Sequence, residues 1–143
     1  MKVLLVVPPF PKIIVDTTSI PLGLASIATC LKHGGHDVTC IDYSVTTIDS
    51  TSIDYSDFDL IGIQLHSVES LGDGISYIKM VRQLTSAKIV VGGVVATMYS
   101  KAIAQKKEID YLVLYEGEYT FLELANALEK GEDIEGIAGL ITS

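Results

Sequence analysis

Two short polar segments carry the residue types that could do chemistry. The first, QLHS, places Gln64, His66 and Ser67 directly after an apolar run. An imidazole can transfer protons near neutral pH, and amide and hydroxyl groups supply hydrogen bonds. A polar surface loop without a function explains His66 equally well. The second segment, YEGEY, holds Glu116 and Glu118, whose carboxylates could do acid–base work but more commonly favour a helix start.

A pair of glycines interrupts the apolar run IVVGGVVAT at residues 89–97. Gly92 and Gly93 have no side chains, so a bulky flat ligand could lie against their backbone. A tight turn between a strand and a helix explains the same pair. The sequence contains no Ser/His/Asp or Cys/His set, no cluster with metal-ligand spacing and no three-cysteine iron–sulfur motif. We therefore expect neither catalytic residues nor a metal site in this chain.

Composition limits the class of protein. The 143 residues suffice for one domain with its own core, and 48% of them are apolar. No stretch reaches the ~18 uncharged apolar residues of a membrane helix, and prolines end the opening MKVLLVVPPFP before a signal peptide could form. The net charge of −8 repels nucleic acid and anionic lipid. We expect one cytoplasmic domain over 1–143, with Cys30 and Cys40 as buried free thiols.

The elements that must position these residues follow from hydrophobic patterning. Continuous apolar runs predict buried strands at 2–7, 37–42, 60–65, 88–93, 110–115 and, more weakly, 138–142. Helical spacing predicts helices over 21–33, 70–84, 118–130 and, more weakly, 97–106. Thr120 and Glu123 fit a capping box at the third helix, and 43–57 is expected to be an irregular crossover.

Alternating strands and helices predict an α/β fold with a parallel sheet covered by helices on both faces. Two strand orders fit, 3-2-1-4-5-6 and 2-1-3-4-5, and in both a ligand binds beyond the carboxyl ends of the strands. The loop after the first strand, PPFPKIIVDTTSI, has no dinucleotide fingerprint, no P-loop and no Ser/Thr-rich flavin phosphate loop. A receiver domain is excluded because the first and third strands lack its acidic residues.

Five segments resemble, in order, the N-terminal cobalamin-binding domain of radical S-adenosylmethionine enzymes: MKVLLVVPPF, PLGLASIATCLKHGGHDVTCID, DLIGIQLHS, VVGGVVAT and IDYLVLYEGEYTFLELANALEKGEDIEGIAGLI. The most specific part is EGEYTFLELANAL after EIDYLVLY. The resemblance implies a flavodoxin-like three-layer fold with strand order 2-1-3-4-5. It also implies a following barrel that holds S-adenosylmethionine and a 4Fe-4S cluster, and that this chain does not include.

The resemblance further implies where a cobalamin would lie. The corrin ring is expected over the carboxyl ends of the strands, near Pro9, Phe10, Gln64, Leu65, His66 and Ser67. The nucleotide tail is expected beside Gly92, Gly93 and Val94, running toward Glu116 and Gly117. Such a placement would explain the bare backbone of VVGGVVAT.

Two departures from related methyltransferase modules affect the interpretation. No D-x-H-x-x-G follows the first strand, so a bound corrinoid is expected base-off without that histidine. Gln64 and His66 stand where the S-x-L motif has Ser and Leu. The leading hypothesis is a domain that presents a corrinoid to a radical barrel, for methyl transfer or, second, for ring closure or rearrangement. The alternatives are a degenerate interaction or lid domain without corrinoid and, less favoured, a flavodoxin-like domain for another nucleotide.

Overall fold

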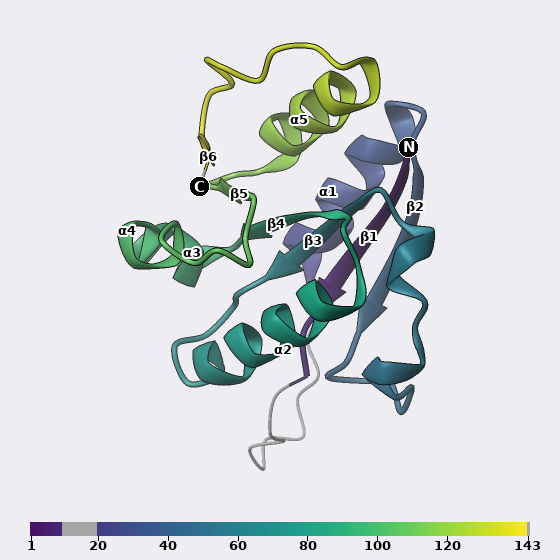
Figure 1. Cartoon of the computed structure of the whole chain (residues 1–143), viewed down its shortest axis with the longest axis vertical. Helices are drawn as coiled ribbons and strands as arrows, with labels where there is room; N and C mark the ends of the chain where they lie inside the picture. The colour runs from purple at the N-terminus through teal and green to yellow at the C-terminus, as the bar shows by residue number, and fades with distance from the viewer. Residues whose placement is uncertain (10–19, 143) are drawn as a thin grey trace.

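The apolar runs form six strands of one sheet (Figure 1). The computed structural model describes residues 1–9 and 20–142, and its strands are β1 (Lys2–Val7), β2 (Asp37–Asp42), β3 (Leu60–Gln64), β4 (Lys88–Gly92), β5 (Tyr111–Val113) and β6 (Leu140–Thr142). Their order is β2-β1-β3-β4-β5-β6, with β1 to β5 parallel and β6 antiparallel to β5. This confirms the predicted α/β class and the 2-1-3-4-5 order, to which β6 adds an edge strand.

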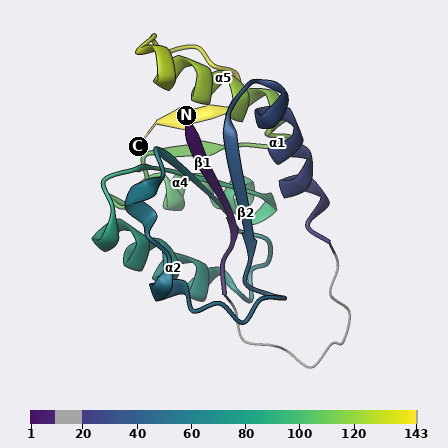
Figure 2. The ribbon, with the colours of Figure 1, turned by 90° about the vertical axis from the view of Figure 1, so that its right-hand side faces the viewer.

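Helices cover both faces of the sheet, with α1 and α2 on opposite sides (Figure 2). One layer contains α1 (Leu22–His33) and α5 (Glu118–Lys130). The other contains α2 (Leu71–Leu84), α3 (Val94–Met98) and α4 (Ser100–Ile103). The segment after β2 forms only two short 3-10 turns, η1 (Ser50–Ser52) and η2 (Tyr55–Asp57), as its Ser, Thr and Asp content predicts.

Strand residues alternate between two apolar clusters. On β1, Val3 and Leu5 pack with α1 and α5, whereas Leu4 and Val6 pack with the layer that contains α2. Five of the six residues of β1 are buried for this reason. The same alternation decides which side chains of β3, β4 and β5 face α1 and α5 where these strands end.

Two predictions about the helices are wrong. Helix α5 begins at Glu118 with Gly117 as its N-cap, so Thr120 lies inside the helix and caps nothing. The Thr120 hydroxyl instead donates to the carbonyl of Ala138, 2.7 Å away, and ties the segment before β6 to α5. The helix predicted over 97–106 starts three residues earlier and divides into α3 and α4 at Tyr99, whose φ of −112° departs from helical geometry.

The two cysteines are free but not buried as predicted. Cys30 is half-buried on α1, and Cys40 is exposed on β2. Strand β2 lies at the edge of the sheet and is followed by the irregular crossover, so part of it is left uncovered. Among the described residues, no helix is long and apolar enough to cross a lipid bilayer.

Candidate functional site

A cavity of about 360 Å³ opens where β3, β4 and β5 end, on the face that α1 and α5 cover. Parallel strands place their carboxyl ends at one edge of the sheet, so the polar loops predicted from the sequence meet there. The wall consists of Leu5, Gly23, Leu24, Ile27, Gly62, Ile63, Gln64, Val90, Gly92, Gly93, Val94, Thr97, Met98, Val113, Tyr115, Glu116, Gly117, Glu118 and Phe121.

Strand β3 directs Gln64 toward the cavity. Leu60 packs with α1 and α5, and alternation places Gly62 and Gln64 on the same face. A Cβ at Gly62 would come within 2.8 Å of Phe121, so the glycine lets α5 approach the sheet beside Gln64. The Gln64 Oε1 atom is buried, and no group among the described residues donates a hydrogen bond to it. A buried acceptor without a partner is unusual in a folded protein.

The turn between β4 and α3 assigns different roles to its two glycines. Gly93 has φ of +101°, and a Cβ there would lie 2.6 Å from the carbonyl oxygen of Leu65. That carbonyl accepts from the Val95 amide at 3.3 Å, while the Leu65 amide donates to Gly92 at 2.8 Å. The fold itself therefore requires Gly93, as the tight-turn explanation predicts. A Cβ at Gly92 meets its nearest neighbour, the Val113 carbonyl, at an ordinary 3.5 Å, so this residue leaves the cavity floor open.

The loop between β5 and α5 forms the opposite wall. Tyr115 has φ of +57°, a conformation that is costly for a residue with a side chain, and its amide donates to the Thr97 hydroxyl at 3.1 Å. The Thr97 hydroxyl donates to the carbonyl of Gly93 at 3.3 Å. These two bonds fix the loop after β5 against the turn after β4. Gly117 follows, and a Cβ there would collide with Val113 at 2.8 Å.

The structure brings six of the eleven predicted site residues into the cavity wall: Gln64, Gly92, Gly93, Val94, Glu116 and Gly117. The other described ones lie outside it. Leu65 is buried in the core beside α2, and His66 is exposed. Ser67 accepts from the Ser70 amide at 3.3 Å in the loop before α2, and Pro9 is half-buried after β1. Phe10 lies outside the described residues.

Sequence reasoning missed the contribution of α1. Gly23, Leu24 and Ile27 line the cavity, although the apolar stripe of this helix predicted only a core-facing surface. Thr97 and Met98 were also missed because they were assigned to a later helix. The signal was present in the adjacent small and apolar residues of PLGLA and VVAT.

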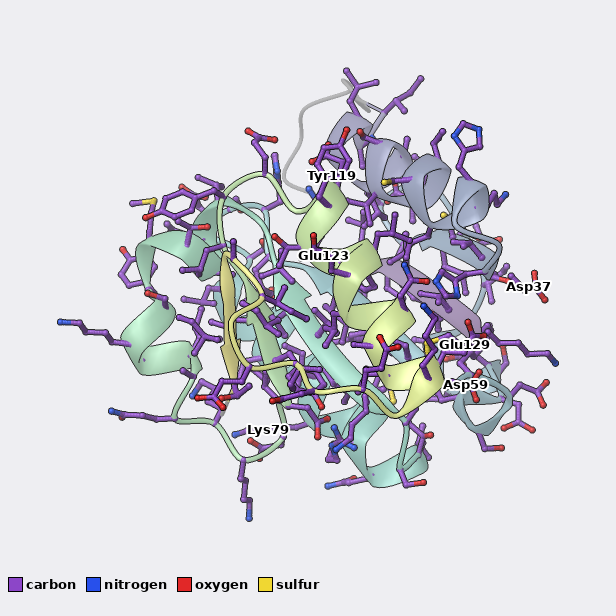
Figure 3. All side chains as sticks on the ribbon, turned by 90° about the horizontal axis from the view of Figure 1, so that it is seen from above. Asp37, Asp59, Lys79, Tyr119, Glu123 and Glu129 are labelled. Atoms are coloured by element: carbon purple, nitrogen blue, oxygen red, sulfur yellow. The ribbon has the colours of Figure 1, made fainter. Side chains whose placement is uncertain are left out.

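Several large apolar side chains are exposed in or beside the cavity wall. Met98 is 65% exposed and Tyr115 78% in the wall itself, and Leu22, 74% exposed, and Tyr119, 78% exposed, adjoin the wall residues Gly23 and Glu118 in the chain. Figure 3 shows Tyr119 near the N-terminal end of α5, one turn before Glu123. Large apolar side chains this exposed on neighbouring elements mark a surface suited to contact with a ligand or another protein domain. Within residues 1–9 and 20–142, no three His, Cys, Asp or Glu residues gather as metal ligands.

Known proteins are similar to this chain in sequence. A family model described as the B12 binding domain matches residues 13–125. A Pyrococcus horikoshii protein named as an uncharacterized methyltransferase is 35% identical over 98% of this chain and 32% of its own length. The anaerobic magnesium-protoporphyrin IX monomethyl ester cyclase of Synechocystis is 32% identical over 98% of this chain and 30% of its own length. The chain thus spans about a third of the curated relatives that it matches.

Solved structures agree with the family match. The radical S-adenosylmethionine methyltransferase TsrM from Kitasatospora setae, solved with cobalamin and a [4Fe-4S] cluster, superposes with a TM-score of 0.82 and 26% identity, over 99% of this chain and 27% of that one. The cobalamin-dependent S-adenosylmethionine radical enzyme OxsB has a TM-score of 0.78 over 97% of this chain and 20% of its own. At 20% identity, OxsB supports the fold alone. The family match over most of the chain, the strand order and the site at the strand ends lead to one conclusion: this chain belongs to the family of B12-binding domains.

Proposed function

We propose that this chain holds a corrinoid at the carboxyl ends of its strands and inserts the nucleotide tail into the cavity between α1, α5 and the sheet. One observation carries the proposal: a cavity of about 360 Å³ opens at the carboxyl ends of the strands, with Gln64, Gly92 and Gly117 in its wall. Such a volume falls within the range of small-molecule sites, and mostly apolar walls with a few polar groups are typical of them. The residues present therefore fit a flat, partly polar ligand.

The cavity residues are proposed to have different roles in binding. Gly92 leaves space for the tail against the backbone, and Gly117 keeps the opposite wall back. Gly93 allows the tight turn between β4 and α3, so its proposed role is to shape the cavity wall. Glu116 is exposed at the mouth, where it remains beside solvent as the tail enters. Val94 is also exposed in the cavity wall and offers apolar contact.

The corrin ring is proposed to lie over the strand ends, next to the Pro9–Phe10 segment and the loop of His66 and Ser67. Leu65 would act from beneath, by fixing the backbone between Gln64 and His66. The sequence has no histidine between His33 and Met1, so the loop after β1 offers no lower ligand and the corrinoid is proposed to bind base-off. When bound, a corrinoid supplies a cobalt centre for methyl transfer or related radical chemistry, while the protein binds, orients and shields it.

The proposed context is a longer cytoplasmic enzyme in which residues 1–143 form one domain. The TsrM chain, solved with cobalamin and a [4Fe-4S] cluster, is several times longer than its match to this chain and supports a radical S-adenosylmethionine barrel as partner. Methyl transfer is the leading reaction, supported by TsrM, and ring closure is the next, supported by the Synechocystis cyclase. The exposed apolar residues around the mouth suit contact with such a barrel.

The same apolar mouth favours one alternative, a module without corrinoid that serves as an interaction or lid domain. His66 supports it too, because this side chain is exposed and lies outside the cavity wall. The cavity of about 360 Å³ favours the corrinoid, since contact with another domain requires no such space.

A titration with hydroxocobalamin separates the two functions. The purified chain is incubated with the cofactor under oxidising and reducing conditions and passed through gel filtration, and the visible spectrum of the protein fraction is recorded. We expect a retained spectrum of the base-off form. A colourless protein fraction under both conditions would contradict the corrinoid function and support the interaction module.

A further inference from the structure

We infer that Tyr115 is a ligand-binding residue whose ring covers the nucleotide tail at the cavity mouth and shields it from water. The inference rests on the proposed function and assigns a role to a side chain that stands where the backbone favours glycine. It follows from the backbone conformation of Tyr115, the exposure of its side chain and its place in the cavity wall.

The backbone at Tyr115 would suit glycine better than tyrosine. Its φ is +57°, and within residues 1–9 and 20–142 every other residue with a positive φ is a glycine. A Cβ in this conformation approaches the following carbonyl oxygen, a contact that glycine avoids. The hydrogen bond from the Tyr115 amide to the Thr97 hydroxyl, at 3.1 Å, holds the conformation in place. Because this bond uses only the backbone at position 115, a glycine could make it as well.

The fold gains little from the Tyr115 side chain. It is 78% exposed, so it buries little apolar area against the rest of the domain. Among the residues that the structure describes, its hydroxyl has no hydrogen bond and its ring has no aromatic or cation–π contact. Residues that break a local conformational preference without a compensating contact concentrate at functional sites. Contact with a ligand would give this side chain the role that the fold does not.

The place of Tyr115 in the wall indicates which part of the ligand it contacts. It lies in the loop between β5 and α5, two residues before Gly117, and Gly92 belongs to the facing wall. These two glycines leave the space proposed for the tail. A tyrosine ring combines a large apolar area with a polar tip, and an exposed side chain changes rotamer within nanoseconds. The ring can therefore turn onto a tail that enters the cavity, which removes apolar area from water.

Affinities for two corrinoids test the contact. Dissociation constants of cobalamin and of cobinamide, which lacks the tail, are measured with the purified chain. We expect Tyr115→Ala to weaken cobalamin by about tenfold, as loss of a partly buried ring should, and to leave cobinamide unchanged. Tyr115→Phe keeps the ring and should bind cobalamin like the parent. Tyr99→Ala is the control, because Tyr99 is 41% exposed and lies outside the cavity wall.

A stability measurement distinguishes a ligand contact from a structural role. Tyr115→Gly removes both the ring and the Cβ that the backbone conformation disfavours. We expect this variant to unfold at a higher urea concentration than Tyr115→Ala and at no lower a concentration than the parent. Its cobalamin affinity should nevertheless fall as far as that of Tyr115→Ala. A tyrosine that served the fold would give the opposite result, lower stability with unchanged affinity.

Chemical modification reports the position of the ring in the unaltered chain. N-acetylimidazole acetylates exposed tyrosine hydroxyls, and mass spectrometry gives the rate at each tyrosine. We expect Tyr115 to react more slowly when cobalamin is bound than in the free chain, and to react at the free rate when cobinamide is bound. Tyr99 should react at the same rate in all three samples.

Several outcomes would overturn the inference while leaving the proposed function in place. These are parental cobalamin affinity in Tyr115→Ala and Tyr115→Gly, or a Tyr115 that reacts equally fast with and without bound cobalamin, and both would leave the ring for contact with another domain. Equal losses for cobalamin and cobinamide would place the ring over the corrin. A loss in Tyr115→Phe as large as in Tyr115→Ala would assign binding to the hydroxyl. A parent chain that does not retain cobalamin would contradict the proposed function, and the inference with it.

Discussion

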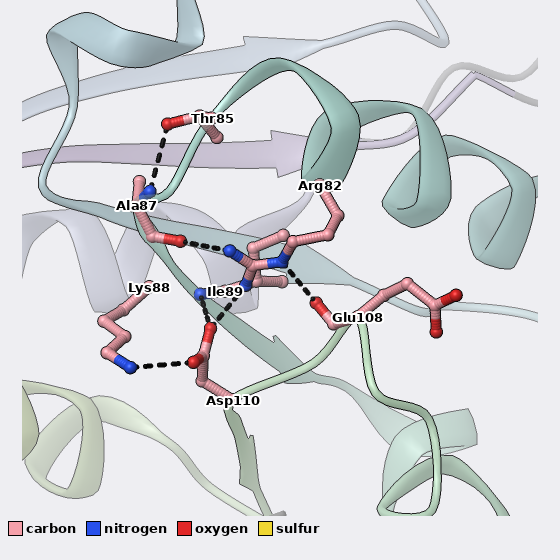
Figure 4. Close-up of polar contacts among 7 residues, drawn as sticks. All are labelled: Arg82, Thr85, Ala87, Lys88, Ile89, Glu108 and Asp110. Atoms are coloured by element: carbon pink, nitrogen blue, oxygen red, sulfur yellow. Dashed lines mark hydrogen bonds and ion pairs between the residues drawn. The ribbon is translucent and has the colours of Figure 1, made fainter.

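The two ends of the sheet differ in how far their polar groups are hydrogen-bonded. At the amino ends of β4 and β5, Arg82 of α2 donates to the carbonyls of Glu108 at 3.1 Å and Ala87 at 3.0 Å, and to the Asp110 carboxylate at 2.5 Å (Figure 4). Asp110 also accepts from Lys88 and from the Ile89 amide, both at 2.9 Å. These interactions join α2 to the segments at the amino ends of β4 and β5 and stabilise the fold.

At the carboxyl ends the chain leaves groups unsatisfied. The Gln64 amide oxygen has no donor within residues 1–9 and 20–142, Tyr115 adopts a strained backbone conformation, and Gly92 leaves space that a side chain could fill. The difference teaches that the contacts that stabilise the fold and the proposed ligand site are separated along the strands, since the amino ends of β4 and β5 are rich in hydrogen bonds and the carboxyl ends enclose a cavity. Changes at the two ends should therefore affect different measurements.

The largest effect is expected from filling the cavity. A leucine at Gly92 meets no backbone atom closer than 3.5 Å at its Cβ, so the domain should fold, but the rest of the side chain would occupy the space of the tail. We expect Gly92→Leu to weaken cobalamin binding at least about a hundredfold, equivalent to roughly 2.7 kcal/mol. Gly72→Leu on α2, where nothing lies within 4 Å, is the matched control. Unchanged affinity in a folded Gly92→Leu protein would remove the tail from this cavity.

Removing charged groups at the amino ends of β4 and β5 should lower stability and leave cobalamin affinity unchanged. Asp110→Ala leaves the largely buried Arg82 guanidinium without its carboxylate, and we expect the free energy of unfolding to fall by about 2 kcal/mol. Lys88 is half exposed, so Lys88→Ala should cost less than about 1 kcal/mol. Urea unfolding measures both, and the cobalamin dissociation constant should change in neither. Reduced affinity in either variant would couple the two ends.

The pH dependence of stability tests whether Asp110, at the amino end of β5, stabilises the fold. Burial opposes ionisation of Asp110, but the hydrogen bonds from the Ile89 amide and Lys88, with the charge of Arg82, hold the pKa of its carboxyl below the usual value. A lowered pKa in the folded state stabilises the protein above the unfolded value of about 3.9, and this stabilisation is lost as pH falls through the lower folded value. The stability gap between the parent and Asp110→Asn should therefore be widest near neutral pH and shrink below about pH 4. Urea unfolding near neutral pH and below about pH 4 measures this difference, and an equal difference in unfolding free energy at both would contradict the role of the Asp110 carboxylate.

The smallest effect is expected at His66. Its side chain is exposed and outside the cavity wall, so His66→Ala should alter the visible spectrum of bound cobalamin slightly and its affinity by less than about threefold, or roughly 0.65 kcal/mol. Loss of the bound cofactor in this variant would assign His66 a ligand role that its position does not indicate.

The sequence predicted most of the fold because burial on both faces leaves a strong signal. Continuous runs such as residues 2–7 and 88–92 are apolar at every interior position, and only a sheet between two helical layers requires that. The crossover over 43–57 was recognisable by its Ser, Thr and Asp residues, whose side chains bond nearby backbone amides, as Asp49 does with Thr51 at 2.9 Å.

The details of the site were less predictable, because they depend on contacts between distant segments. Nothing in EYT distinguishes a capping Thr120 from one that bonds Ala138 eighteen residues later. Gly92 and Gly93 look alike in sequence, yet only Gly93 has a positive φ and abuts Leu65. The burial of the Gln64 Oε1 atom depends on tertiary packing at the end of β3, which no local pattern reveals.

The central claim is that the cavity binds the nucleotide tail, and one comparison tests it most directly. Dissociation constants of the purified chain are measured for cobalamin and for cobinamide, the corrinoid that lacks the nucleotide tail. The account predicts that cobinamide binds at least about a hundredfold more weakly and that Gly92→Leu does not weaken it further. Equal affinity of the two corrinoids, or a further loss of cobinamide binding in Gly92→Leu, would contradict it.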